Sequence, residues 1–144
     1  MNIREAADGD APSLAGLLGQ LGYPADARDL PRRLTRLAER GTAVAFVAEM
    51  EGRVVGVTTA HAFASIHAER DVAWLTTLVV DEKARGQGIG STLVTRAEAW
   101  AIQHGAPRIS LTSALHRKHA HDFYKTRNYE HTGVRLTKIF ADQR

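Results

Sequence analysis

A short glycine-rich segment has the residue types and spacing to hold a phosphate group. It comprises Arg85, Gly86, Gln87, Gly88, Ile89, Gly90 and Ser91. It follows the apolar run 75–80 and opens a stretch in which Ile89, Leu93 and Ala97 recur at helical spacing. The first N–H groups of a helix lack partners within it, and the helix dipole places partial positive charge there. Because glycine also lets the backbone approach a bulky anion, the segment predicts a phosphate cradle over residues 86–91.

The spacing of the glycines distinguishes among phosphate-binding loops. A dinucleotide-binding loop reads G-x-G-x-x-G, whereas residues 86–90 read G-x-G-x-G. A P-loop requires a lysine between its last glycine and the next serine or threonine, and here Gly90 is followed directly by Ser91. Neither motif is present, so these residues alone leave open a generic nucleotide-phosphate site or a purely structural tight turn.

The pattern R-x-x-G-x-G, after a strand ending in Leu78, Val79 and Val80, resembles the signature of the GNAT superfamily, the acyl-CoA-dependent N-acyltransferases. The resemblance implies that acetyl-CoA is the co-substrate and that the loop binds its pyrophosphate. It implies that backbone groups of Leu78, Val79 and Val80 bind the pantetheine arm. It further implies that the backbone N–H of Val80 or Val79 polarises the thioester carbonyl.

Residues 120–129 resemble a second element of the same superfamily, A-x-x-F/L-Y-x-x-x-G-F/Y. Asn128 stands where glycine is usual, and asparagine tolerates the left-handed conformation that ends a helix. Arg117 stands at a CoA-contacting position where many members have asparagine. The resemblance implies that Tyr124 protonates the departing thiolate, which suits a phenol placed beside sulfur. The helix by itself favours another interpretation, in which Phe123 and Tyr124 are a core pair.

The residues predict direct acyl transfer. The chain contains no cysteine, which excludes disulfides and a thiol acyl-enzyme, and it shows no signature of a serine triad. We therefore expect the amine to attack the bound thioester, form a tetrahedral intermediate and release the thiolate. The amine must lose its proton first, because an ammonium group has no lone pair.

The general base for that step is not evident. Residues 74–78 carry no acid, whereas many GNAT members have a carboxylate on this strand; Thr76 or Thr77 could instead hold a water molecule. The candidates near the expected site are His67, Glu69, Asp71, His116 and His121. The histidines form no H-E-x-x-H motif or paired cluster, so we expect no metal site.

The elements that must position these residues form a mixed α/β pattern. Strands are expected over 2–6, 43–50, 53–60, 72–80 and 108–112, and a final hairpin over 129–140 turns near Gly133. Helices are expected from an N-cap at Asp8 or Asp10 to a stop at Gly22, and over 29–40, 88–104 and 117–126. The resemblance implies a single GNAT-like domain over 1–144. Its sheet would be mixed, mostly antiparallel and twisted, with a parallel βαβ core and about four flanking helices.

Composition narrows the class of protein. The chain has 144 residues, of which 44% are hydrophobic and 24% charged, as in one globular domain. A net charge of +3 suits an anionic ligand but is too small to indicate a nucleic acid partner. The N-terminus has no signal-peptide pattern, and no apolar run is long enough to span a membrane. We therefore expect a cytoplasmic protein with no membrane partner.

The leading hypothesis is an N-acetyltransferase that transfers an acetyl group from acetyl-CoA to a primary amine of a small molecule or protein. The resemblance also implies a homodimer. It implies an acceptor pocket in which four residues could recognise a cationic amine: Tyr23, Asp26, Glu69 and Asp71. The missing strand carboxylate motivates an alternative, a non-catalytic acyl-CoA-binding sensor or interaction module of the same fold.

Overall fold

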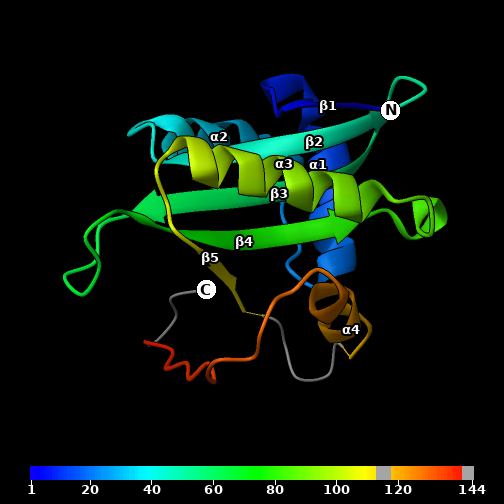
Figure 1. Ribbon diagram of the computed structural model, residues 1–144. Coiled ribbons are helices and arrows are strands. Elements are labelled where there is room, and N and C mark those ends of the chain that lie inside the picture. Colours follow the sequence, from blue (N-terminus) through cyan, green and yellow to red (C-terminus); the bar gives the residue numbers. More distant parts are fainter. Residues whose placement is uncertain (113–117, 141–144) are drawn as a thin grey trace. The chain divides into compact units, whose positions relative to one another are not determined.

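Five strands form one mixed sheet, in the order β1-β2-β3-β4-β5 (Figure 1). They are β1 Asn2–Glu5, β2 Ala43–Met50, β3 Arg53–Phe63, β4 Val72–Val80 and β5 Ile109–Leu111. Neighbouring strands are antiparallel except β4 and β5, which are parallel. The computed structural model describes residues 1–112 and 118–140. It divides into two units, Met1–Leu111, which contains the sheet, and Thr112–Arg144.

Three α-helices belong to the first unit: α1 Ala11–Leu21, α2 Leu30–Ala38 and α3 Ile89–Gln103. A proline lies in the first turn of both α1 and α2, where its missing N–H has no helical partner to lose. Gly22 ends α1 in the left-handed conformation, with φ of 101°. Among the helices that the structure describes, none is both long and apolar enough to cross a membrane.

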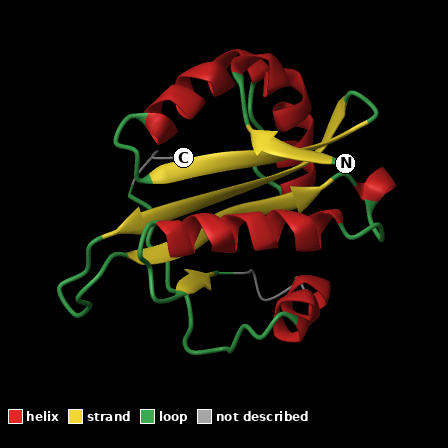
Figure 2. Ribbon diagram, turned by 45° about the horizontal axis from the view of Figure 1, so that its top comes forward, coloured by secondary structure: helices red, strands yellow, loops and turns green. Residues whose placement is uncertain are grey.

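The helices of this unit cover opposite faces of the sheet. Val47, Val57 and Val79 form a buried cluster with residues of α1 and α2, and we call their side of the sheet the α1 face. Side chains alternate between faces along a strand, so Phe46 and Gly56 lie on the other side, where they meet Arg96 and Leu93 of α3. We call that side the α3 face. Figure 2 shows the strands between these two helical layers.

Asp10 occupies the predicted N-cap position of α1 but does not cap the helix with its side chain. Its carboxylate instead accepts two hydrogen bonds from the Arg4 guanidinium, each 2.9 Å long, and one of 2.8 Å from the backbone N–H of Ala7. Arg4 also donates from Nε to Glu49 of β2, at 3.0 Å. This buried carboxylate therefore ties the start of α1 to the first two strands.

The second unit contains α4, Lys118–Thr126, and the following segment. The prediction of a hairpin over 129–140 is wrong, because these residues form no strand. Val134 and Leu136 alternate with polar residues as in a strand, yet both side chains are exposed. An isolated two-stranded hairpin is marginally stable in water, so such a pattern needs a further strand or helix to pack against.

Candidate functional site

A bulge in β4 changes the direction of its backbone groups. Thr59 of β3 is the partner of Thr77, while the next residue, Ala60, is the partner of Leu75. Thr76 is therefore an extra residue in β4, and its hydroxyl lies 2.7 Å from that of Thr59. An extra residue reverses which backbone groups face each neighbouring strand.

The hydrogen bonds on each side of the bulge confirm this reversal. Before it, the N–H of Ala73 points toward β5 and donates to Arg108 at 3.2 Å. After it, the N–H of Asp81 points toward β3 and donates to Val55 at 2.8 Å. Backbone N–H and C=O groups point to alternate sides along a strand. Those of Val79 therefore also point toward β3, whereas those of Leu78 and Val80 point toward the opposite edge of β4.

That edge is left without a strand partner. β5 pairs with β4 only from Ala73 to Leu75, so within residues 1–112 and 118–140 no strand pairs with this edge beyond the bulge. The carbonyl oxygen of Val80 accepts a hydrogen bond from Nε of Arg85, at 3.1 Å. The N–H groups of Leu78 and Val80 thus form a short edge to which an extended, amide-containing ligand can hydrogen-bond.

The glycine-rich segment lies immediately after this edge. Gly86 and Gly88 have φ of 82° and 78°, a region that other residues adopt only with strain. Gly88 is the N-cap of α3 and contributes no side-chain cap, while Ile89 anchors the helix with a buried side chain. Residues 85–88 are exposed. The loop therefore presents the positive end of the α3 dipole to solvent, as an anion site requires.

Gly56 of β3 allows α3 to approach the sheet at this point, and the sequence analysis missed it. A Cβ added at Gly56 would lie 3.0 Å from Cδ1 of Leu93 and 3.3 Å from Cγ2 of Ile89. Gly56 is the partner of Val80 in the β3–β4 pairing. In the sequence, a glycine inside a predicted strand is the feature that indicates such close packing.

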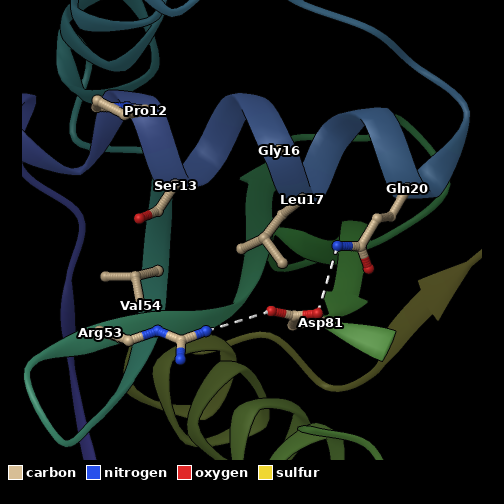
Figure 3. Close-up of a pocket in the computed structure, with 8 residues that line it drawn as sticks. All are labelled: Pro12, Ser13, Gly16, Leu17, Gln20, Arg53, Val54 and Asp81. Carbon is tan, nitrogen blue, oxygen red and sulfur yellow. Dashed lines mark hydrogen bonds and ion pairs between the residues drawn. The ribbon is translucent and has the colours of Figure 1, made fainter. Parts of the chain in front are cut away.

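Gln20 of α1 holds the turn between β4 and the loop, and it too was missed (Figure 3). Its Oε1 accepts the N–H of Glu82 at 2.9 Å, and its Nε2 donates to Asp81 at 3.4 Å. The N–H of Lys83 bonds to the Asp81 carboxylate and lowers its pKa, an effect to which Gln20 and Arg53 add. An open pocket beside this link is lined by Pro12, Ser13, Gly16, Leu17, Gln20, Arg53, Val54 and Asp81.

The three candidate bases of the first unit do not lie at this edge. His67, Glu69 and Asp71 lie in the loop before β4, at the opposite end of that strand from the glycine loop. The ring of His67 is exposed and bonds to Ser65 at 2.7 Å, with Arg108 at 3.4 Å. His121 lies on α4 in the second unit, and His116 and Arg117 lie outside the described residues. In the part of the chain that the structure describes, no three metal-ligating side chains gather.

Tyr124 is partly buried in a group of aromatic rings in the second unit. Its ring meets Phe123 and Tyr129 edge to face, with centroids 5.3 Å and 5.6 Å away. The N–H of Tyr129 donates to the carbonyl of Tyr124 at 3.1 Å. Asn128, with φ of 69°, adopts the left-handed conformation expected of it. The aromatic contacts orient the ring and are compatible with both interpretations of Tyr124.

The comparisons with known proteins agree on one family. Residues 14–129 match the profile of the Acetyltransferase (GNAT) family. An uncharacterized N-acetyltransferase of Bacillus subtilis, YhfO, is 30% identical over 135 residues, which are 90% of each chain. The aminoalkylphosphonate N-acetyltransferase of Salmonella typhimurium is 37% identical over 87 residues, 60% of this chain and 56% of the relative. A putative acetyltransferase from Agrobacterium tumefaciens, 24% identical, has the same fold, with a TM-score of 0.84 over 96% of this chain and all of that one.

Proposed function

Because the chain belongs to the acetyltransferase (GNAT) family, we propose that it transfers the acetyl group of acetyl-CoA to a primary amine of a small molecule or a protein. The match covers most of the chain and includes both sequence elements discussed above. The chain is a GNAT N-acetyltransferase, and membership of this family favours an enzyme over the non-catalytic module considered from the sequence.

The observation that supports acetyl-CoA as substrate is the continuity of two binding features. A free strand edge at Leu78 and Val80 leads directly into a glycine loop at the N-terminus of a 15-residue helix. Acetyl-CoA has matching parts in the same order, an amide-containing pantetheine arm and a pyrophosphate. The residues proposed to hold it are Leu78, Val79, Val80, Arg85, Gly86, Gln87, Gly88, Ile89, Gly90, Ser91 and Arg117.

The direction of the backbone groups refines the proposed mechanism. The thioester is at the far end of the pantetheine arm from the pyrophosphate. Leu78 lies two residues, about 7 Å, farther from the loop than Val80. We therefore assign the thioester carbonyl to the N–H of Leu78 and the pantetheine to Val80. Val79 would act by fixing the strand between these two positions, because its N–H faces β3 and its side chain is buried. An N–H at that carbonyl stabilises the negative charge that develops as the amine attacks.

Proton transfers complete the proposed reaction. The C–N bond forms as the neutral amine attacks, the C–S bond breaks, and the thiolate needs a proton. Tyr124 supplies it in this proposal, on the strength of the motif in α4. The acceptor gives one proton to a base before it attacks, and the second N–H proton, released as the amide forms, restores the Tyr124 hydroxyl through solvent.

The acceptor is proposed only as a class. The relative from Salmonella acts on aminoalkylphosphonates, which are primary amines that carry an anionic group. In this chain, Asp26 is held by Arg28 at 2.7 Å, and this pairing lowers the pKa of its carboxyl. A carboxylate already paired with arginine is a poor site for a cationic amine, so we favour amines with an anionic substituent over polycationic acceptors.

Isothermal titration with acetyl-CoA tests the proposal. We expect micromolar binding that is lost in Gly88→Val, because a β-branched residue is strained at that φ and blocks the cradle. Gly41→Val is the matched control, since Gly41 has φ of 66° and lies after α2, outside the proposed site. A folded wild-type protein that does not bind acetyl-CoA would overturn the proposed function.

An amine panel then tests the acceptor class. 2-Aminoethylphosphonate and L-aspartate represent amines with an anionic group, kanamycin a polycation, and a lysine peptide a protein amine. Release of free CoA measures turnover of each. Preferential acetylation of kanamycin would contradict the favoured class while leaving the acetyltransferase assignment intact.

A further inference from the structure

We propose that His61 of β3 is the base that takes the proton from the acceptor amine, through a bridging water molecule. The inference rests on the proposed function and supplies the proton acceptor that the sequence analysis could not find.

His61 is the one ionisable side chain on β3 after Arg53, and β4 has none. Its strand partners are Ala43 on β2 and Trp74 on β4, and neither carries a charge. The side chain is half-buried, and no hydrogen bond joins its ring nitrogens to any residue of 1–112 or 118–140. Burial lowers the pKa of this ring, because desolvation disfavours the imidazolium. This shift favours the neutral ring, which is the form able to accept a proton.

The side chain of His61 lies on the face from which an acceptor can approach. Alternation along β3 places Val57, Thr59 and His61 on the α1 face. The glycine loop leads into α3 on the other face, so acetyl-CoA would reach the free edge from there. An amine must then approach the thioester from the α1 face. α1 packs over Val57 and Val79 on this face, whereas Thr76 is exposed.

Two hydroxyl groups on the same face provide a route for the proton. The hydroxyls of Thr59 and Thr76 lie 2.7 Å apart, at the bulge next to the free edge. Thr59 is two residues from His61 on one strand, so their side chains are neighbours on the α1 face. A water molecule held by these hydroxyls can accept a proton from the amine and pass one to the imidazole. The imidazolium formed then releases the proton to solvent.

Activity as a function of pH tests this role. We expect His61→Gln to lower kcat/KM at pH 7 by about 10²–10⁴-fold, with the Kd for acetyl-CoA unchanged. The deficit should narrow above the pKa of the acceptor amine, where the amine is already neutral in solution. A purely structural histidine would lower the rate by the same factor at every pH. His104→Gln is the matched control, because His104 stacks on Trp100 at the C-terminus of α3 and has no role in the proposed reaction.

Proton NMR of the wild-type protein gives a second test that needs no acceptor. We expect the His61 ring resonance, assigned with His61→Gln or His61→Asn, to titrate below the ordinary histidine pKa and to shift when acetyl-CoA is added. The resonance of His104 should not shift. If acetyl-CoA binds but His61 does not respond, or if His61→Gln keeps the wild-type pH profile, the inference fails and the acetyltransferase assignment stands. Absence of acetyl-CoA binding would overturn the assignment itself.

Discussion

Gly56 of β3 lies directly against Leu93 of α3, so closely that a Cβ at Gly56 would be 3.0 Å from the Leu93 Cδ1 atom. Gly56→Ala should therefore displace the first turn of α3 and the glycine loop before it. We expect the free energy of unfolding to fall by about 1–2 kcal/mol, as for mild overpacking, and the Kd for acetyl-CoA to rise several-fold. Urea unfolding and isothermal titration measure the two effects.

Gly16 provides the control for this substitution. It lies within α1, is exposed, and has no atom within 4 Å of an added Cβ. Gly16→Ala should raise the free energy of unfolding by about 0.5–1 kcal/mol, because alanine is the better helix former. If the two substitutions changed the free energy of unfolding in the same direction, Gly56 would not be required for close packing of α3.

Much of the fold is predictable because many of its determinants are local. The apolar run 72–80 defines β4 to the residue, and Gly22 ends α1 as predicted because glycine tolerates a positive φ. The missed features depend on residues far apart in the chain. The bulge at Thr76 exists only relative to β3, and Gln20 meets Glu82 across 62 positions. The pattern of residues 129–140 suits a strand, but a strand needs a partner that a local pattern cannot supply.

Asp10 should make stability depend on pH in the acid range. Asp10 is 8% exposed, and the hydrogen bonds from Arg4 lower the pKa of its carboxyl. A carboxyl whose pKa is lowered by folding stabilises the protein above its unfolded pKa of about 3.9, and this contribution is lost as pH falls through the folded value. Asp10→Asn should cost about 2 kcal/mol at pH 7, and the difference from wild type should shrink toward pH 3.

Asp26→Asn is the comparison for Asp10, measured by urea unfolding across the same pH series. Asp26 also pairs with an arginine, Arg28, but both side chains are well exposed. Exposed ion pairs contribute about 0–1 kcal/mol, so this substitution should change stability little at any pH. A pH-independent effect of Asp10→Asn would show that packing, not charge, explains its role.

Tyr124→Phe tests the proposed proton donor. Removal of the hydroxyl leaves the ring contacts with Phe123 and Tyr129 possible, so the fold should persist. We expect kcat to fall by about 10²-fold or more, with the Kd for acetyl-CoA unchanged. Tyr129→Phe removes a hydroxyl from a neighbouring ring and should have a much smaller effect on kcat. Equal rates for Tyr124→Phe and wild type would support the core-pair interpretation.

Hydrogen exchange tests the direction of the backbone groups after the bulge. The N–H of Val79 faces β3, so it should exchange slowly in the free protein. The N–H groups of Leu78 and Val80 face the free edge and should exchange rapidly. Acetyl-CoA in excess should slow exchange at Leu78 and Val80 by at least about tenfold, because it adds hydrogen bonds there, and should leave Val79 nearly unchanged. Rapid exchange at Val79 with protection of its two neighbours in the free protein would mean that the bulge does not reverse the strand, and the thioester carbonyl would then have to be reassigned to Val79.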